Sequence, residues 1–350
     1  MVDIKSLTNT QLERFVTELG EKKFHAGQLF EWMHGKRAVS FQEMTNLSKK
    51  FREQLEQQAY LTVLEQAAVQ VSKQDGTRKY LFRLSDGNVI ESVCMKYQYG
   101  NSVCISSQAG CRMGCTFCAS ADGGLARNLT AAEMAEQVYR IGEDIGERIS
   151  HIVVMGTGEP LDNYENLLQF LRIINDKKGA NISHRNITVS TCGLVPQIRR
   201  LAEEKLQITL ALSLHAPIQE KREALMPVAK VWPLPEVMEA CRDYFEITGR
   251  RISFEYSLIH GKNDTKEDCR ALAELVKGMN CHINLIPVNP VKDTGYRQPD
   301  RSHVQNFKNM LEKSERNVTI RREMGRDIDG ACGQLRQRYM KTGNGVKHES

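Results

Sequence analysis

From about residue 101 onward, the chain alternates short apolar runs with amphipathic stretches of helical periodicity. Such alternation predicts parallel β-strands joined by right-handed crossover helices. Six or seven of these units are too few for a closed eight-stranded barrel, so the pattern predicts an α/β fold built as a partial (β/α)6-type barrel. The expected strands are SVCIS (102–106), HIVVM (151–155), NITVS (186–190), ITLALSL (208–214), RISFEYSLI (251–259), HINLIPV (282–288) and NVTIRR (317–322).

Segments rich in polar residues and glycine follow most of the expected strands. Parallel strands present their carboxyl ends at the same edge of a sheet, so we expect these segments to form one polar rim. Ser190, Ser213 and His215 stand at strand ends, although each alone is more often a structural hydrogen-bonding residue. The segments are SSQAGC, GTGEP, STCG, SLHAP, HGKND and NP.

Two other patterns precede this region. Residues 1–60 place apolar residues at helical spacing and predict a small helical accessory domain. Residues 61–97 contain strand-like runs separated by the turns KQDGTRK and SDGN. We therefore expect a helical domain (1–60), a short β/hairpin segment (61–97), a core (98–340) and a frayed polar tail (341–350).

The composition is typical of a globular protein of the cytoplasm. The 350 residues are 41% hydrophobic and 26% charged, and the N-terminus lacks the apolar run of a signal peptide. No apolar stretch approaches the ~20 residues that a membrane helix needs. Ten cysteines without a short disulfide framework indicate reduced thiols held for metal or redox chemistry. The net charge of +5 permits a nucleic-acid partner without requiring one.

Cys111, Cys115 and Cys118 form the most informative short motif. Their spacing also matches one face of a helix, but Gly110 and Gly114 disfavour a helix and favour a loop wrapped around a metal cluster. Three thiolates would leave one iron of a four-iron, four-sulfur (4Fe-4S) cluster open, and S-adenosylmethionine (SAM) could bind that iron through its amine and carboxylate. A non-catalytic zinc protein that binds RNA, with Cys104 as the fourth ligand, is the alternative.

The cysteine loop belongs to a series of longer motifs: FCASADGGLARNLT, MGTGEPLDNY, VSTCGLVPQI, ALSLHAP, LIPVNP and DIDGACGQL. Together they resemble the RlmN/Cfr family of radical SAM RNA adenine methyltransferases, most of all its RlmN members, over roughly residues 80–340. The resemblance implies a radical SAM barrel and a 4Fe-4S cluster on the three cysteines, with two SAM molecules used per turnover. It further implies SAM contacts at Gly158, Glu159, Ser190, Ser213, Leu214, His215 and Asn289.

The same resemblance implies a two-stage methyl transfer. Cys332, in GACGQL, matches the family's methyl-carrying cysteine, which forms an S-methylcysteine. Cys104 matches the resolving cysteine, which releases the product by forming a transient disulfide with Cys332. Glu91 matches a position described as a proton acceptor. Taken without the resemblance, Cys104 fits burial in an apolar strand and Glu91 fits a solvated strand residue.

The implied substrate is adenosine 2503 of 23S rRNA, in the peptidyl-transferase centre. RlmN proteins methylate carbon 2 of this adenine and Cfr proteins carbon 8; the motifs favour carbon 2. The implied partners are this rRNA, an adenosine of some tRNAs and a flavodoxin-like or other electron donor, and we expect a monomer without a membrane partner. A radical SAM activase acting on a protein glycine would use the same cluster without the second cysteine pair. The basic candidates for RNA contact are Lys49, Lys50, Arg52, Arg78, Lys79, Arg127 with Asn128, Arg321, Arg322, Arg326, Arg336 and Arg338.

Overall fold

A ten-stranded sheet forms the centre of the protein in the computed structural model. The structure describes residues 1–288, 295–328, 335–336 and 339. Its spatial order is β14-β13-β12-β11-β10-β9-β6-β5-β4-β3, and the seven strands from β6 to β14 are parallel. In the described residues, the edge strands β3 and β14 do not pair, so the predicted partial barrel is confirmed. The parallel strands are β6 (Gly100–Cys104), β9 (Ile149–Val154), β10 (Ile187–Thr191), β11 (Thr209–Ser213), β12 (Ile252–Leu258), β13 (Cys281–Pro287) and β14 (Val318–Ile320).

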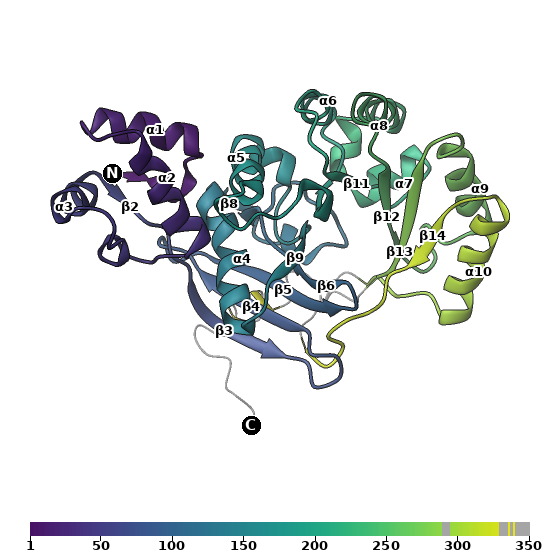
Figure 1. The fold of residues 1–350 in the computed structure, drawn as a ribbon. Helices are drawn as coiled ribbons and strands as arrows, with labels where there is room; N and C mark the ends of the chain where they lie inside the picture. The colour runs from purple at the N-terminus through teal and green to yellow at the C-terminus, as the bar shows by residue number, and fades with distance from the viewer. Residues whose placement is uncertain (289–294, 329–334, 337–338, 340–350) are drawn as a thin grey trace.

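Crossover helices form one layer along the sheet (Figure 1). Helix α4 begins at a capping box in which Thr130 and Glu133 satisfy each other's backbone N–H groups, and it ends at Gly146 with a φ of 64°. A second capping box, of Thr265 and Asp268, begins α9. The helices are α4 (Ala131–Ile145), α5 (Tyr164–Asn175), α6 (Val195–Glu203), α7 (Gln219–Leu225), α8 (Leu234–Thr248), α9 (Lys266–Leu275) and α10 (Arg301–Lys313).

An antiparallel extension, β3 to β5, continues the sheet beyond β6. Its strands are β3 (Glu65–Val71), β4 (Arg78–Arg83) and β5 (Val89–Tyr97). The first turn of the extension joins β3 to β4 and the second joins β4 to β5, where KQDGTRK and SDGN stand in the sequence. The extension lies within residues 61–97.

The N-terminal helices pack on the core through buried polar contacts. Lys5 donates to Glu136 of α4 over 2.9 Å, and both side chains are almost fully buried. The ring of His34 lies 3.0 Å from the hydroxyl of Tyr139, also on α4. The elements of this region are β1 (Val2–Asp3), α1 (Asn9–Glu18), α2 (Phe24–Phe30), a π-helical turn (Glu31–Gly35), α3 (Lys49–Gln58) and β2 (Ala59–Tyr60).

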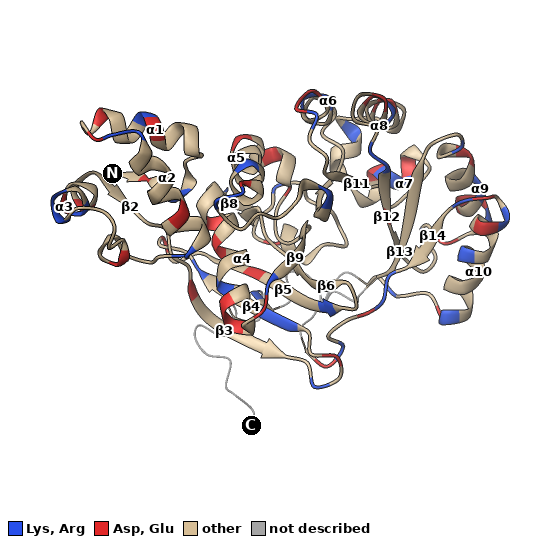
Figure 2. Cartoon of the chain, in the orientation of Figure 1, with Lys and Arg blue, Asp and Glu red and all other residues tan. Residues whose placement is uncertain are grey.

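Charges of both signs are interspersed over the helices and the extension (Figure 2). In the described part of the chain, no helix combines the length and apolar character needed to span a bilayer.

Candidate functional site

A cavity of about 430 Å³ opens at the carboxyl ends of the parallel strands. It brings together Cys104 at the end of β6, Cys118 of the cysteine loop, Ser190 of β10, and Ser213 and His215 at the end of β11. Polar side chains from the ends of several parallel strands therefore meet in this cavity. Other lining residues are Val93, Met95, Phe117, Met155, Gly156, Glu255, Ser257, Arg321, Arg322, Met324, Arg326 and Ile328.

The cysteine loop is closed at its base by a short hairpin that the sequence analysis missed. Strands β7 (Gln108–Gly110) and β8 (Leu125–Asn128) pair antiparallel on either side of the loop. Gly110 has a φ of 85°, and a Cβ there would lie 2.0 Å from the carbonyl oxygen of Gly124. That oxygen accepts a hydrogen bond from the backbone N–H of Cys111 over 3.0 Å. Only glycine fits at position 110, so the loop geometry depends on it.

The loop after β9 is hydrogen-bonded to this hairpin. The side-chain amide of Asn163 donates to the carbonyl oxygens of Ser107 (2.8 Å) and Leu129 (2.7 Å), which flank the two strands. The side-chain amide of Gln108 donates to Asp162 over 2.9 Å, and its carbonyl oxygen accepts from the backbone N–H of Glu159. The GTGEPLDN segment therefore fixes the position of the cysteine loop.

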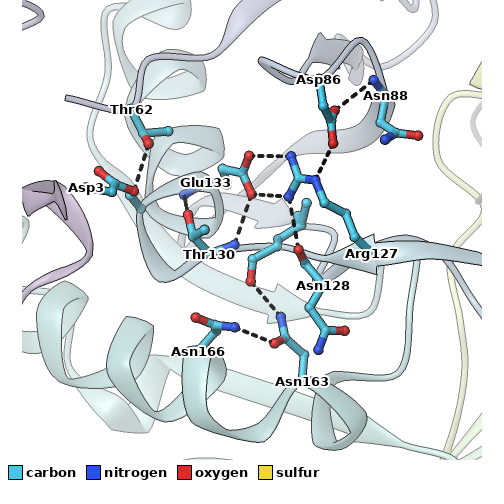
Figure 3. A network of polar contacts seen from close by, with 12 residues as sticks. Asp3, Thr62, Asp86, Asn88, Arg127, Asn128, Thr130, Glu133, Asn163 and Asn166 are labelled. Carbon is cyan, nitrogen blue, oxygen red and sulfur yellow. Dashed lines mark hydrogen bonds and ion pairs between the residues drawn. The ribbon is translucent and has the colours of Figure 1, made fainter. Parts of the chain in front are cut away.

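Arg127, on β8, ties the same hairpin to both the core and the extension (Figure 3). Its guanidinium makes two 2.8 Å hydrogen bonds to Glu133 of α4, and its Nε donates to Asp86 in the β4–β5 turn. Arg127 lowers the pKa of Asp86 to about 2. Because two carboxylates already bind this guanidinium, Arg127 has a structural role that the expected RNA contact did not include.

The three loop thiols lie close enough together to influence one another. Burial raises the pKa of Cys111 to about 11, and the pKa of Cys115 is raised by burial and then by the nearby Cys118 and Cys111. In the part of the chain that is described, no three His, Cys, Asp or Glu side chains converge on one ion. A 4Fe-4S cluster takes each thiolate on a different iron, so its ligands need to lie near one another without converging.

Gly158 and Glu159 contact the loops next to the cavity. Gly158 has a φ of 109°, and a Cβ there would lie 2.6 Å from the Cβ of Gln108. Glu159 is 4% exposed, and its carboxylate accepts hydrogen bonds from the backbone N–H groups of Leu161 (3.0 Å) and Cys192 (2.8 Å). Burial raises its pKa. In this structure Glu159 therefore joins the loops that follow β9 and β10.

His215 presents a neutral ring to the cavity. Its Nδ1 accepts a hydrogen bond from the backbone N–H of Ser257 over 3.0 Å, which leaves the proton on Nε2. Burial and the charge of Arg222 lower its pKa to about 3. The ring packs edge-on against Phe117 of the cysteine loop, with centroids 4.8 Å apart. The neighbouring Leu214 is fully buried.

The hydroxyls of Ser190 and Ser213 lie 3.3 Å apart, so they form one polar patch on β10 and β11. Cys104 is buried beside Val93, Met95 and Met324 in the cavity wall. Three predicted residues, Asn289, Cys332 and Arg338, lie outside the described residues.

Glu91 is buried and is not among the described residues that line the cavity. Lys79 lies 3.0 Å from its carboxylate and is fully buried, so the expectation that Lys79 contacts RNA at the surface is wrong.

Sequence reasoning missed Arg222 altogether. This residue of α7 is fully buried, and its Nη2 donates to the carbonyl oxygen of Cys192 over 2.6 Å. Its Nε donates to the carbonyl oxygen of Leu214 over 3.3 Å. The helix also accepts a hydrogen bond from Thr116 of the cysteine loop at the carbonyl oxygen of Leu225. An arginine in a helix that looks amphipathic carries no sequence signal of such burial.

Two family models match the chain. The Ribosomal RNA large subunit methyltransferase N-terminal domain matches residues 2–61, and the Radical SAM superfamily matches residues 105–276. A relative from Lachnospira eligens, named "Probable dual-specificity RNA methyltransferase RlmN", is 61% identical over 341 residues, or 97% of each chain. A relative of the same name from Lachnoclostridium phytofermentans is 57% identical, covering 97% of this chain and 95% of its own.

A solved structure supports the same similarity. The crystal structure of a radical SAM methyltransferase from Sphaerobacter thermophilus matches with a TM-score of 0.90 at 42% identity. The match covers 95% of this chain and 99% of the other. The similarity therefore extends over the N-terminal helices, the extension and the barrel together.

Proposed function

This chain belongs to the RlmN family of radical SAM RNA methyltransferases, and we propose that it methylates carbon 2 of adenosine 2503 in 23S rRNA and of an adenosine in some tRNAs. The names of its relatives support two RNA substrates, because they describe a dual specificity. One observation carries the proposal: Cys104 lines the same cavity as Cys118 and the serine and histidine side chains of the rim. A volume of about 430 Å³ is in the range of small-molecule sites.

The rim residues are suited to hold SAM. In the proposal, Cys111, Cys115 and Cys118 bind the cluster, whose chemistry with SAM is the reductive generation of a radical. The hydroxyls of Ser190 and Ser213 can donate or accept hydrogen bonds, and the glycine at 158 allows close backbone approach. The other proposed SAM contacts are Glu159, Leu214, His215 and Asn289.

His215 can only donate at its second ring nitrogen, Nε2. Its Nδ1 is occupied by the N–H of Ser257, and its lowered pKa keeps the ring neutral at physiological pH. Nε2 therefore offers an N–H to an acceptor on the cofactor without adding a charge to the cavity.

Cys332 and Cys104 carry out successive steps of the methyl transfer. Cys332 carries the methyl group on its sulfur and delivers the one-carbon unit to the adenine. Cys104, as a thiolate, then attacks the sulfur of Cys332: the S–S bond forms, the C–S bond breaks, and its electron pair stays on the carbon, which takes up a proton and becomes the methyl group of the product. The position of Cys104 in the cavity wall suits this attack, since its sulfur is buried away from competing oxidants.

The remaining parts of the proposal concern partners. The enzyme works in the cytoplasm as a monomer and takes electrons from a flavodoxin-like or other donor. Arg321, Arg322 and Arg326 line the cavity, so they are the basic candidates best placed to contact RNA near the reacting base. Recognition of a single adenine would then use an unstacked base.

Mass spectrometry of nucleosides tests the proposal. Protein-free 23S rRNA and tRNA are incubated anaerobically with the reconstituted enzyme, SAM and a reductant, and then digested. We expect 2-methyladenosine, which is lost in Cys332→Ala and Cys104→Ala and kept in Cys241→Ala, a buried cysteine outside the cavity lining. Appearance of 8-methyladenosine would make this a Cfr-type enzyme. SAM cleavage without any methyladenosine would refute the RNA substrate.

A further inference from the structure

Arg222, on α7, is a fully buried cation that has no carboxylate partner among the described residues. Its guanidinium donates to backbone carbonyl oxygens instead, those of Cys192 (2.6 Å), Leu214 (3.3 Å) and Ser213 (3.4 Å). Its Nη1 is buried and makes no hydrogen bond to any described residue. A buried charge that meets only neutral groups recovers little of the free energy it loses on leaving water. An anion close to Arg222 would therefore be strongly stabilising.

Arg222 lies behind the wall of the cavity and is not among the described residues that line it. Ser213 and Leu214, which supply two of the carbonyl groups, are at the end of β11, and Cys192 follows β10. The guanidinium is close enough to act on the lining residue His215, whose pKa is lowered by burial and then by the charge of Arg222. Arg222 can therefore influence the cavity through its charge without touching a molecule bound there.

Three thiols are close enough to stabilise this cation. Burial lowers the pKa of Arg222, and the thiols of Cys192, Cys115 and Cys241 act in the opposite direction. Burial also raises the pKa of Cys241 to about 12 and that of Cys192 well above its usual range, so both of these thiols stay neutral. Cys115 differs from them because it belongs to the cysteine loop, where binding of a metal cluster requires a thiolate.

The helix that carries Arg222 is bonded to the cysteine loop. Thr116, next to Cys115 in the sequence, donates its backbone N–H to the carbonyl oxygen of Leu225 over 3.0 Å. The hydroxyl of Thr116 lies 3.3 Å from the same oxygen. Leu225 is the last residue of α7, three positions after Arg222. The cation is therefore held at a fixed position relative to the loop.

Glu159 does not supply the missing negative charge directly. Its carboxylate accepts from the backbone N–H of Cys192 over 2.8 Å, whereas Arg222 binds the carbonyl oxygen of the same residue. The two charged groups thus contact different atoms of the Cys192 backbone and form no ion pair with each other. Burial also raises the pKa of Glu159, which makes its charged form less stable.

A cluster bound to the cysteine loop would bring the negative charge that Arg222 lacks. Its cysteine ligands bind as thiolates, and reduction by one electron adds a further negative charge. The uncompensated guanidinium near Cys115 therefore fits such a group.

We infer that Arg222 is the buried counter-charge of the cysteine loop, and that it stabilises the reduced cluster more than the oxidised one. The inference rests on the cluster in the proposed function and not on the RNA substrate. Arg222 is not a catalytic residue in this account, because it acts only through its charge. A cation in a site without water is screened weakly, so its effect on a nearby anion is large.

The midpoint potential of the cluster measures this effect without SAM or RNA. The full-length enzyme is reconstituted anaerobically with iron and sulfide and titrated with dithionite, which supplies the electron that each cluster takes up. Electron paramagnetic resonance then gives the reduced fraction at each potential. Arg222→Gln and Arg222→Lys are compared, because both side chains are shorter and can donate to a carbonyl group, but only lysine keeps the charge.

We expect Arg222→Gln to lower the equilibrium constant for reduction at least tenfold, which makes the midpoint potential about 59 mV more negative. Arg222→Lys should stay within about threefold of the wild-type constant, because the charge is kept. Lys230→Gln is the matched control: this exposed lysine ends the short turn Pro227–Lys230 that follows α7, and water screens its charge, so the wild-type value is expected. Iron and sulfide analysis of each variant measures how much cluster is bound.

A wild-type potential in Arg222→Gln would overturn the inference. Equal shifts in Arg222→Gln and Arg222→Lys would also overturn it, since they would assign the effect to hydrogen-bond geometry and not to charge. Loss of the cluster from both variants would have the same meaning, whereas loss from Arg222→Gln alone would support the counter-charge. Failure of the proposed function gives a different result: the cluster would form and its potential would shift in Arg222→Gln, but the wild-type enzyme would yield no methyladenosine.

Discussion

Different interactions fix the positions of residues in the parallel half of the sheet and in its antiparallel extension. Around the cavity, position depends on close backbone approach: a Cβ on Gly156 would lie 2.7 Å from the carbonyl oxygen of Ile105, and Gly110 and Gly158 are equally restricted. In the extension, position depends on charge, as in the Lys79–Glu91 pair. A glycine packed this closely against backbone cannot gain a side-chain atom. A residue of an ion pair can be replaced as long as the partner's charge still has a hydrogen-bonding or charged neighbour.

The largest expected effect comes from the parallel half. Gly110→Ala should reduce iron and sulfide bound after reconstitution at least tenfold, because the new Cβ collides with the carbonyl oxygen of Gly124 at a φ of 85°. Gly123→Ala is the matched control in the same loop: its φ is 81° but nothing lies within 4 Å of the new Cβ. It should cost only the ~1–2 kcal/mol of left-handed backbone. Full iron binding by Gly110→Ala would contradict the argument.

The next effect tests the extension. Lys79→Met should lower the free energy of unfolding by about 3–5 kcal/mol, because it leaves the Glu91 carboxylate buried without its cation. Lys96→Met removes an exposed ion pair on the adjacent strand and should cost less than about 1 kcal/mol. Urea denaturation measures both. Equal losses in the two variants would show that burial does not distinguish these pairs.

A smaller effect is expected where the two regions join, at Arg127. Glu133→Gln should cost about 2 kcal/mol, since Glu133 is buried and accepts two hydrogen bonds from the guanidinium. Asp86→Asn should cost less than about 1 kcal/mol, because the Asp86 side chain is 37% exposed. Thermal unfolding compares them, and a larger loss in Asp86→Asn would reverse the ranking.

The smallest effect is a pH dependence from outside both regions. Burial lowers the pKa of His34 to about 3, so between about pH 3 and 6.5 the unfolded chain binds a proton that the folded chain does not. Stability should therefore fall by about 1.4 kcal/mol for each pH unit below 6.5 on account of this residue. Between pH 6.5 and 5.5, where the unfolded histidine is only partly protonated, His34→Phe should reduce the loss of stability by about 1 kcal/mol in urea denaturation. An unchanged slope would assign the acid sensitivity to other groups.

The contrast between the regions also explains what the sequence could predict. All seven parallel strands were predicted from apolar runs, because the apolar residues of each strand lie next to one another in the sequence. The cluster loop and rim were predicted because glycine, cysteine and serine stand at fixed places after those runs. The β7–β8 hairpin was missed because its short strands are held by Asn163, which is distant in sequence.

A contact between the extension and Arg336 was missed for a similar reason. The backbone N–H of Arg336 donates to Glu91, 245 positions away, and no local pattern in either segment indicates that they meet. Arg222 was missed because burial of a cation is decided by the surrounding carbonyl groups, which periodicity does not report. Sequence reasoning thus reached the meeting of strand ends, which the parallel topology dictates, and failed for individual side-chain contacts between segments distant in the sequence.

The strand order has a consequence for how the protein is made. From β3 to β14, each strand of the sheet lies beside one already synthesised, so the growing chain can add strands to an edge as they leave the ribosome. The contact between Ser72 and Asp327 spans 255 positions, which take roughly 10–50 s to translate at ~5–20 residues per second. During that interval, the contact between the C-terminal segment and the first strands of the sheet has not yet formed. Asp327 is translated after all ten strands of the sheet and returns to the end of the first of them, so this contact forms only once the parallel strands have been made.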